Sequence, residues 1–577
     1  MEAKNNEILD LKEQLRQLKK RSHISDGTTP SPVRKKNMIS LFRQSVGSAP
    51  NLKINLQTRL YIMKLLRRGC SYRQVIGVLD DIKILIPNDL LHIGATPCMG
   101  TVHKIFVEFA LLVKMQIAEI FNNDSKIGHS TDETPDLDGC PILASCIQDL
   151  QSGKIYIIGL SRMGRKPSED MRRVEEQTLR ALHYMSNNRN EFNFVEHFLS
   201  RVAVRGGDNS ATERKYHNNL NNEAIRSSLV GVIQPNLPRI SCQLHLDSNI
   251  LRHLEKVLAG SSIVFPIIKL VTKHLGQRSA TPERMEFVNF MNIVKNQKPL
   301  KLASQTGVRF IELAKFSDNL MAMFPDIIQF VNTLEDTRPM KMELKRLTTN
   351  VNLENFYVDL QIIVCINATI IEPTYRAAIN PEVTIIEYKN IMLKLLDLCS
   401  LDSTEFLENI LLMHNVPFIA KYYKPTALQS QAMDKISCGW NDIDRSRGIT
   451  IIEKFKAVIS NDLRNTNAIL LGVELPSEIS NVGGLLNNNA IESSFGILDY
   501  MSRHHLNLSF MFRECVVMAT KNDFFSWFDR KNVDEKVFLL KTVKSQRDNI
   551  LKMINEHYDL EQKVRSDRLA FGSLNIP

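Results

Sequence analysis

The sequence predicts an α/β core that is interrupted by a large all-α insertion and preceded by a small helical domain. Three observations support this fold class. Helical apolar spacing covers residues 56–117, short β-rich runs lie between residues 141 and 244, and helical spacing alone dominates from 251 to about 480. A chain of 577 residues is also longer than one hydrophobic core usually supports, so several structural units are expected.

Seven segments follow from these changes in pattern. They are a short helix or coiled coil (1–21), a basic disordered linker (22–51), a helix-turn-helix-like domain (52–122), the first part of the α/β core (123–250), the helical insertion (251–480), the last part of the core (481–535), and a C-terminal helix with a tail (536–577).

The N-terminal tail is basic. Residues 1–49 contain ten Lys and Arg against five Asp and Glu, which accounts for about half of the net charge of +10. Such a tail fits either a polyanionic partner or a simply solvated, disordered segment. Arg34-Lys35-Lys36 beside Pro32 fits a nuclear address, so a nuclear location is expected.

Cysteine usage and hydropathy predict a soluble protein in a reducing compartment. The nine cysteines form no C-x-x-C pair, and an odd number does not suit a secreted disulfide framework. The apolar run around Gln361–Ile371 is too short and too polar for a membrane span. No membrane partner is expected.

The first helical domain opens with two short helices joined by a glycine turn. Leu56, Leu60, Met63 and Leu66 repeat at helical spacing, and Gly69 ends that helix. Ser71 and Gln74 have the spacing of a capping box that starts the second helix.

A third helix is predicted to begin with Thr96 as N-cap and Pro97 at the first helical position. Its inward residues would be Val102, Phe106, Phe109, Val113 and Ile117. This is the pattern of a helix-turn-helix module, in which Arg67, Arg68 and Arg73 near the turn would meet DNA phosphates. An ordinary helical subdomain has the same pattern.

The next block reads as strands and helices. Pro141–Gln148 and Lys154–Leu160 are β-rich and are separated by a turn at 151–153. A helix is predicted at about Ser168–Tyr184, a short strand from Val202 that delivers Asp208 just past its end, and another strand at Arg239–Leu244. The segment 121–131 before Asp132 is mostly polar, so it gives a weak strand signal.

After the helical insertion, one more helix is predicted to start at Asn488 or Asn489. Its inward face would consist of Ile491, Phe495, Leu498 and Met501. Glu492 follows Ile491 directly, so it would lie in the first turn at the border of the buried stripe.

Three acidic residues, Asp132, Asp208 and Glu492, could form one metal site. Phosphodiester cleavage develops charge on two oxygens, and two Mg²⁺ or Mn²⁺ ions held by carboxylates stabilise both. Alternatives remain for each acid. Asp132 competes with Glu133, Asp136 and Asp138, whereas Asp208 could cap a helix and Glu492 could complement a helix dipole.

A second constellation is Cys242-Gln243-Leu244-His245. A C-x-x-H pair could supply two zinc ligands, but no matching second pair is evident, so a packed cysteine and a hydrogen-bonded histidine are favoured and no zinc is expected. P-loop, G-x-S-x-G, H-E-x-x-H and dinucleotide-binding motifs do not occur, which argues against a nucleotide-driven motor or an acyl-transfer enzyme.

These motifs together resemble eukaryotic DDE-type DNA transposases of the hAT-like group and proteins derived from them. The resemblance rests on 130–134 (STDET), 207–217 (GDNSATERKYH), the C-x-x-H pair, and 488–499 (NNAIESSFGILD), of which the last is the most specific. It implies an RNase H-like core with an inserted helical domain, and Asp132, Asp208 and Glu492 as catalytic, metal-binding acids.

The resemblance further implies a nuclear protein that binds double-stranded DNA, forms a homo-oligomer, and carries out DNA cleavage and strand transfer with Mg²⁺ or Mn²⁺. The alternative is a domesticated, catalytically inactive chromatin or DNA-binding factor that keeps the fold.

Overall fold

The computed structural model describes most of the chain from residue 54 onward. The described residues are 54, 56–85, 96–120, 125–135, 140–163, 168–185, 194–207, 212, 215–216, 239–276, 279–300, 302, 312–349, 353–411, 421–466, 470–471, 479, 489–505 and 508–573. The predicted N-terminal helix (1–21), the whole predicted linker (22–51) and Asp208 therefore lie outside them.

The chain divides into two compact units. The first is Met1–Leu112 with Phe525–Arg547, and the second is Val113–Phe524 with Asp548–Pro577. The described residues are mostly helical, at 74%, and include a small mixed sheet of five strands. This is compatible with an α/β core and a helical insertion.

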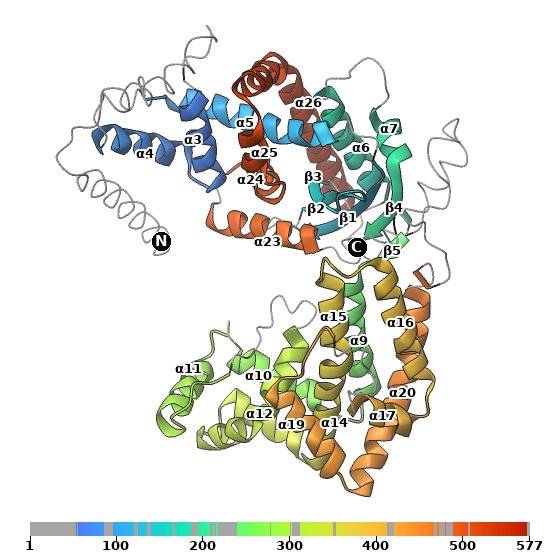
Figure 1. Ribbon diagram of the computed structural model, residues 1–577. Coiled ribbons are helices and arrows are strands. Elements are labelled where there is room, and N and C mark those ends of the chain that lie inside the picture. The colour runs from blue at the N-terminus through green and yellow to red at the C-terminus, as the bar shows by residue number, and fades with distance from the viewer. Residues whose placement is uncertain are drawn as a thin grey trace, which may run out of the picture. The chain divides into compact units, whose positions relative to one another are not determined.

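The first unit contains α3 (Leu56–Arg67), α4 (Tyr72–Leu85), the start of α5 (Met99–Ile120), most of α25 (Phe524–Arg530) and the start of α26 (Val533–Ser573) (Figure 1). The turn between α3 and α4 is as predicted. Gly69 has φ of 80°, its N–H donates to the Leu66 carbonyl, and the Cys70 N–H donates to the Leu65 carbonyl, which is a Schellman ending.

The predicted capping box at the start of α4 is confirmed. The Ser71 hydroxyl accepts from the Gln74 N–H, while the Gln74 side chain accepts from the Ser71 N–H at 2.8 Å. The predicted start of α5 is wrong by two residues. That helix begins at Met99, and the Thr96 hydroxyl instead donates to Asp80 of α4 at 2.5 Å.

The sheet of the second unit has the order β3-β2-β1-β4-β5. Its strands are β1 (Ile127–Pro135), β2 (Pro141–Asp149), β3 (Ile155–Arg162), β4 (Val202–Gly207) and β5 (Arg239–Ser241). The first three are antiparallel neighbours, and β4 and β5 run parallel to β1. The predicted strands are confirmed, except that the last ends at Ser241 because a helix starts at Gln243.

Helices cover both faces of this sheet. α6 (Ser168–Met185) packs on β2 and β3, and α7 (Phe194–Arg201) leads into β4. α23 (Asn489–His504) packs on β1, β2 and β3 from the other side, and α24 (Phe510–Lys521) packs on β3 (Figure 1). The predicted inward residues of α23 are all buried: Ile491, Phe495, Leu498 and Met501.

The described residues of the predicted insertion (251–480) form helices joined by turns and loops, and the first of these helices begins before residue 251. Its elements are α9 (Gln243–Leu258), α10 (Val264–Leu275), α11 (Pro282–Asn289), the π-helical turn η1 (Phe290–Val294), α12 (Glu312–Thr333), α13 (Pro339–Thr348), α14 (Leu353–Ile366), the π-helical turn η2 (Asn367–Ile371), α15 (Glu372–Ile379), α16 (Ile385–Ser400), α17 (Ser403–Leu411), α19 (Ala427–Cys438) and α20 (Asp442–Thr466).

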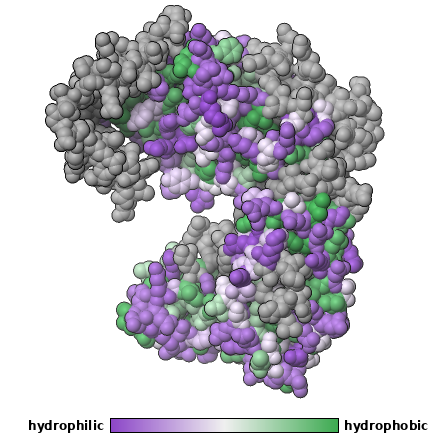
Figure 2. All heavy atoms as spheres, in the orientation of Figure 1, coloured by the Kyte–Doolittle hydropathy of each residue, from purple (hydrophilic) through white to green (hydrophobic). Residues whose placement is uncertain are grey.

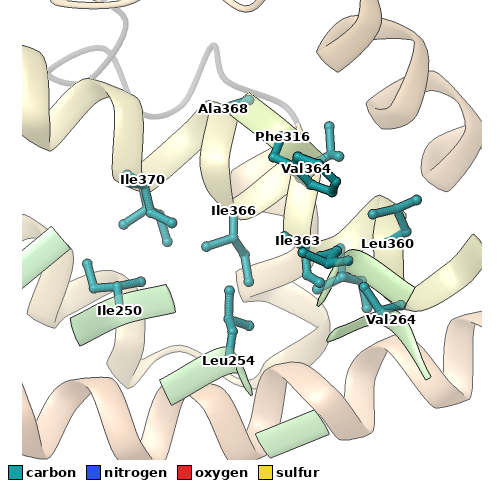
Figure 3. Packing of buried hydrophobic residues seen from close by; sticks show 14 of the residues in the cluster. Ile250, Leu254, Val264, Phe316, Leu360, Ile363, Val364, Ile366, Ala368 and Ile370 are labelled. Atoms are coloured by element: carbon teal, nitrogen blue, oxygen red, sulfur yellow. The ribbon is translucent and has the colours of Figure 1, made fainter. Parts of the chain in front are cut away.

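Apolar side chains fill the interior of the insertion. Ile250 and Leu254 of α9 lie near Ile366 and Ile370, all fully buried (Figure 3). The continuous helix Leu353–Ile379 is long and apolar enough to cross a membrane, but 94% of its apolar window is buried inside the protein. Its hydrophobicity is thus explained by core packing. On the face drawn in Figure 2, hydrophilic residues predominate among the described atoms.

Candidate functional site

Asp132 lies in the central region of the sheet. It belongs to β1, where it pairs with Ala144 of β2, and only 6% of its surface is exposed. One carboxylate oxygen accepts the Glu133 N–H at 2.8 Å. Burial raises the pKa of the neighbouring Cys146 thiol to about 12, with the Asp132 charge as a further cause. A buried carboxylate thus lies beside a thiol that stays protonated at neutral pH.

The two faces of β1 have different neighbours. The His129 ring contacts the Glu175 carboxylate of α6 at 2.7 Å, so His129 points to the α6 face. Successive side chains of a strand alternate between faces, so Asp132 points to the opposite face and Glu133 to the same face as His129. Since α23 packs on that opposite side, Asp132 shares a face with the helix that carries Glu492.

This alternation separates the competing candidates for the first acid. Glu133 lies on the α6 side, whereas Asp132 lies on the α23 side. Asp136 and Asp138 lie outside the described residues. Among the candidates that can be placed, Asp132 has the position that suits a site shared with α23.

The predicted second acid follows the end of β4. Gly207, the last residue of that strand, pairs with Thr131, which directly precedes Asp132. Because β1 and β4 are parallel, both strands finish toward the same edge of the sheet. Asp208 itself lies outside the described residues, so its side chain is not placed.

Glu492 occupies the first turn of α23 and is half-buried. The next residue, Ser493, accepts a hydrogen bond from the Lys521 ammonium at 2.5 Å. Burial lowers the pKa of Lys521. Sequence reasoning missed this lysine, because its contact with Ser493 arises from the packing of α24 beside α23.

Two of the three predicted acids are placed, and Asp208 is not. Within the described residues, no group of three or more His, Cys, Asp and Glu side chains could hold a metal ion. Asp208 does not belong to those residues. The structure places Asp132 on a face of the sheet and Glu492 on the helix that packs there.

Cys242 closes the end of β4 through its backbone. Its N–H donates to the Gly207 carbonyl at 2.7 Å, and the residue is the buried N-cap of α9. His245 is in the first turn of that helix, and its side chain lies outside what the structure describes. Cys242 therefore has a structural role next to the strand end that leads to Asp208.

A buried ionic cluster lies on the opposite, α6 face. Arg205 of β4 pairs in register with His129, and both lie near Glu175. Burial lowers the pKa of Arg205, although the Glu175 charge opposes this shift. The sequence shows only a short basic strand here, so the pairing could not be predicted.

The three arginines predicted to bind DNA have different surroundings within the first unit. The Arg67 guanidinium lies 5.1 Å from the centre of the Phe525 ring and is half-buried, whereas Arg68 and Arg73 are exposed. Arg67 therefore contributes to packing. A deeper arginine, Arg59, is paired with the buried Glu108 of α5.

Positive charge is concentrated in this unit. Met1–Leu112 and Phe525–Arg547 together hold 24 Lys and Arg against 12 Asp and Glu, while the whole chain holds 73 against 63. The remainder of the chain thus has a small acidic excess. This distribution could not be read from the linear sequence, because Phe525–Arg547 is remote from the N-terminal helices in the chain.

No known protein family model matches the chain, and no curated protein matches it significantly.

Proposed function

We propose that the chain is a transposase-like, DNA-binding protein with an RNase H-like core that directs metal-dependent DNA cleavage and strand transfer. The order β3-β2-β1-β4-β5 supports this proposal, because an RNase H-like sheet has this order with three antiparallel strands followed by two parallel ones. The long helical segment between β5 and α23 fits an insertion in such a core.

The observation that carries the proposal is the convergence of three chain segments at one place. Asp132 follows Thr131, whose partner on β4 is Gly207, and α23 packs on β1. Asp208 directly follows Gly207 in the sequence, and its place beside Asp132 is part of the proposal. We propose that these segments, which are far apart in the sequence, bring Asp132, Asp208 and Glu492 together beside β1.

The side chains available suit Mg²⁺ or Mn²⁺. These ions prefer carboxylate oxygens, and the buried Asp132 carboxylate faces the side on which the Glu492 helix packs. Asp132, Asp208 and Glu492 would hold the ions. Two bound divalent cations would stabilise charge on the attacking and leaving oxygens of a phosphodiester. The protein would bind and orient the strand beside these acids.

DNA binding is assigned to the first unit. Its twofold excess of basic over acidic residues suits a polyanion, and its α3-turn-α4 geometry suits a helix-turn-helix. Arg68 and Arg73 are exposed beside that turn and would contact phosphates. The proposed partner is double-stranded DNA, with a nuclear location and a homo-oligomeric assembly.

The test is cleavage of labelled DNA from the gene's own flanks with Mn²⁺. Asp132→Asn and Glu492→Gln should each lower the cleavage rate about 100-fold or more. Removing a side chain that only hydrogen-bonds to a metal ligand lowers activity by up to about 100-fold, and removing the ligand itself should lower it at least as much. Glu133→Gln is the matched control, since that side chain points to the opposite face, and it should cleave normally.

Equal cleavage by the wild type and Glu492→Gln would remove Glu492 from the site. If the wild type binds duplex DNA but cleaves none, the alternative of an inactive, transposase-derived DNA-binding factor is preferred.

A further inference from the structure

The solvent-facing side of α23 carries a regular series of residues. Glu492, Gly496, Tyr500 and His504 are spaced by four, so they lie along one face of the helix. Gly496, Tyr500 and His504 are exposed, while the opposite side is buried. We call these four residues the Tyr500 face. It begins at the proposed metal ligand and runs toward the C-terminal end of the helix.

Gly496 has no evident role in the fold. Glycine lowers the stability of a helix relative to alanine. A Cβ atom at Gly496 would meet nothing within 4 Å, whereas one at Gly159 would clash with Thr178 and one at Gly448 with Trp440. The missing side chain therefore does not serve internal packing. It leaves bare helix surface one turn from Glu492, where a ligand backbone can approach closely.

Tyr500 and His504 form an exposed ring pair. Their centroids are 4.5 Å apart at an interplanar angle of 41°, and Tyr500 is 54% exposed. Arg503 lies beside them and is paired with Asp499 at 2.9 Å. Aromatic rings with an accessible face stack on bases, and neighbouring basic side chains bind the phosphates. Arg503 and His504 make the last turn of α23 basic.

The spacing suits nucleotides next to a cleavage site. Tyr500 is eight residues from Glu492, which is about 12 Å along the helix axis. At about 3.4 Å per nucleotide, this distance corresponds to three or four nucleotides. A strand whose scissile phosphate lies near Glu492 would thus bring a nearby base to the rings.

We propose that the Tyr500 face binds a single DNA strand beside the cleavage site, with Gly496 admitting its backbone, Tyr500 and His504 stacking one base, and Arg503 contacting phosphate. This inference rests on the proposed function and specifies the partner. The strand is unpaired because duplex bases expose only their edges in the grooves, whereas an unpaired base offers its flat face.

The first test measures binding of the full-length protein to a fluorescent single-stranded oligonucleotide in EDTA. Tyr500→Ala and His504→Ala should each raise the Kd about 5- to 100-fold, as expected for loss of base stacking. Tyr500→Trp, which keeps an aromatic ring for stacking, should bind about as tightly as the wild type. Binding to duplex DNA should change less than about twofold, because the rings stack only on unpaired bases.

Ile443→Ala is the control, since Ile443 is a 77% exposed apolar residue of α20. It should leave both affinities unchanged. Unchanged single-strand binding by Tyr500→Ala, an equal loss on duplex DNA, or no single-strand binding by the wild type would overturn the inference.

A second variant separates binding from folding. Gly496→Ala should raise the melting temperature, because the added methyl group meets open space in a helix. It should also weaken single-strand binding, and an unchanged Kd in this more stable variant would contradict the role of Gly496.

The EDTA assay contains no metal, so its result is independent of cleavage. Loss of binding in Tyr500→Ala without any cleavage by the wild type would sustain this inference and refute the proposed catalysis. Cleavage by the wild type with unchanged binding in Tyr500→Ala would sustain the proposed catalysis and refute the role of the Tyr500 face.

Discussion

The sheet and the helical insertion are both well buried, but they bury different chemistry. β1 buries four consecutive polar residues, His129 to Asp132, whereas α14 buries Ile362, Ile363 and Val364 in succession. Apolar burial is favourable wherever the side chains exclude water. Polar burial requires a suitable neighbour for each group. The stability of the sheet therefore depends on specific polar contacts, whereas the stability of the insertion depends mainly on apolar packing.

The buried charges in the insertion follow the same requirement. Asp359 is fully buried and is held by Arg447 through two hydrogen bonds of 2.7 and 2.6 Å. Asp318 accepts from the side-chain amides of Asn367 and Gln429. Among the described residues of the insertion, no more than two consecutive residues are buried and polar, as at Ser317 and Asp318, whereas β1 has four in succession. Strand β1 is thus specialised for placing polar side chains.

Thiol reactivity provides the largest contrast between interior and surface. Burial raises the pKa of Cys146 in the sheet and of Cys365 and Cys399 in the insertion to about 12, while hydrogen bonds from Thr101 lower the pKa of the exposed Cys98. At pH 8, Cys98 should react with a disulfide reagent on the order of 1,000-fold faster, because only thiolates react.

Mass spectrometry of the labelled protein measures these rates. The three buried thiols should ionise only as the pH rises toward 12, so their contribution to stability is present below the unfolded-state pKa and lost in alkali. Equal labelling of Cys146 and Cys98 at pH 8 would show that the sheet is open to water.

Removing Arg447 tests whether the insertion tolerates an unpaired buried charge. Arg447→Met leaves Asp359 buried without its cation and should lower the free energy of unfolding by about 3–5 kcal/mol. Arg338→Met is the control, because its partner Glu286 is partly exposed, and it should cost about 0–1 kcal/mol. Urea denaturation measures both, and equal losses would refute the buried pairing.

Removing the Asn522 side chain tests the edge of the sheet. Its amide donates to the Ile157 carbonyl and accepts from the Ile157 N–H, both at 2.8 Å, so it occupies the open edge of β3. Asn522→Ala should cost about 2–4 kcal/mol, since two buried backbone groups lose their partners. Exposed Asn465→Ala should change stability by less than about 0.5 kcal/mol in the same unfolding assay. A comparable effect of both would contradict this role.

Two glycines offer the smallest and most direct contrast. A Cβ at Gly159 of β3 would lie 2.6 Å from the Thr178 methyl group, whereas one at Gly77 of α4 would meet nothing within 4 Å. Gly159→Ala should destabilise by about 1–3 kcal/mol, and Thr178→Ser should relieve part of that loss. Gly77→Ala should stabilise by about 0.5–1 kcal/mol in thermal unfolding. The same sign for both would show that the sheet packing is looser than described.

Most helices and strands followed from the sequence because apolar spacing reports directly on burial. The inward residues of α5 and α23 and the two strands of the β2–β3 hairpin were predicted in this way. β1 gave only a weak signal, since its burial is polar and depends on partners from other elements. The sequence also did not predict that Phe525–Arg547 belongs to the same compact unit as the N-terminal helices, because no local pattern encodes this.

The site was predicted less completely than the fold. Asp132 and Glu492 were chosen for their motifs, but the sequence could not decide between Asp132 and Glu133. Only the direction of His129 toward Glu175 fixes which of them faces α23. The contact of Lys521 with Ser493 joins residues 28 positions apart on two packed helices, so no local sequence pattern predicts it.

The hydrogen bonds between Asn522 and Ile157 also bear on the order in which the sheet is completed during synthesis. Ile157 leaves the ribosome 365 residues before its partner, and Glu514, which accepts from the Leu160 N–H, follows that strand by 354 residues. Until α24 arrives, the nascent chain has an unprotected β3 edge, and an unpaired strand edge recruits strands from other chains. Truncation before α24 should therefore yield aggregates, and chaperone protection is needed longest at the part of the chain that is made early.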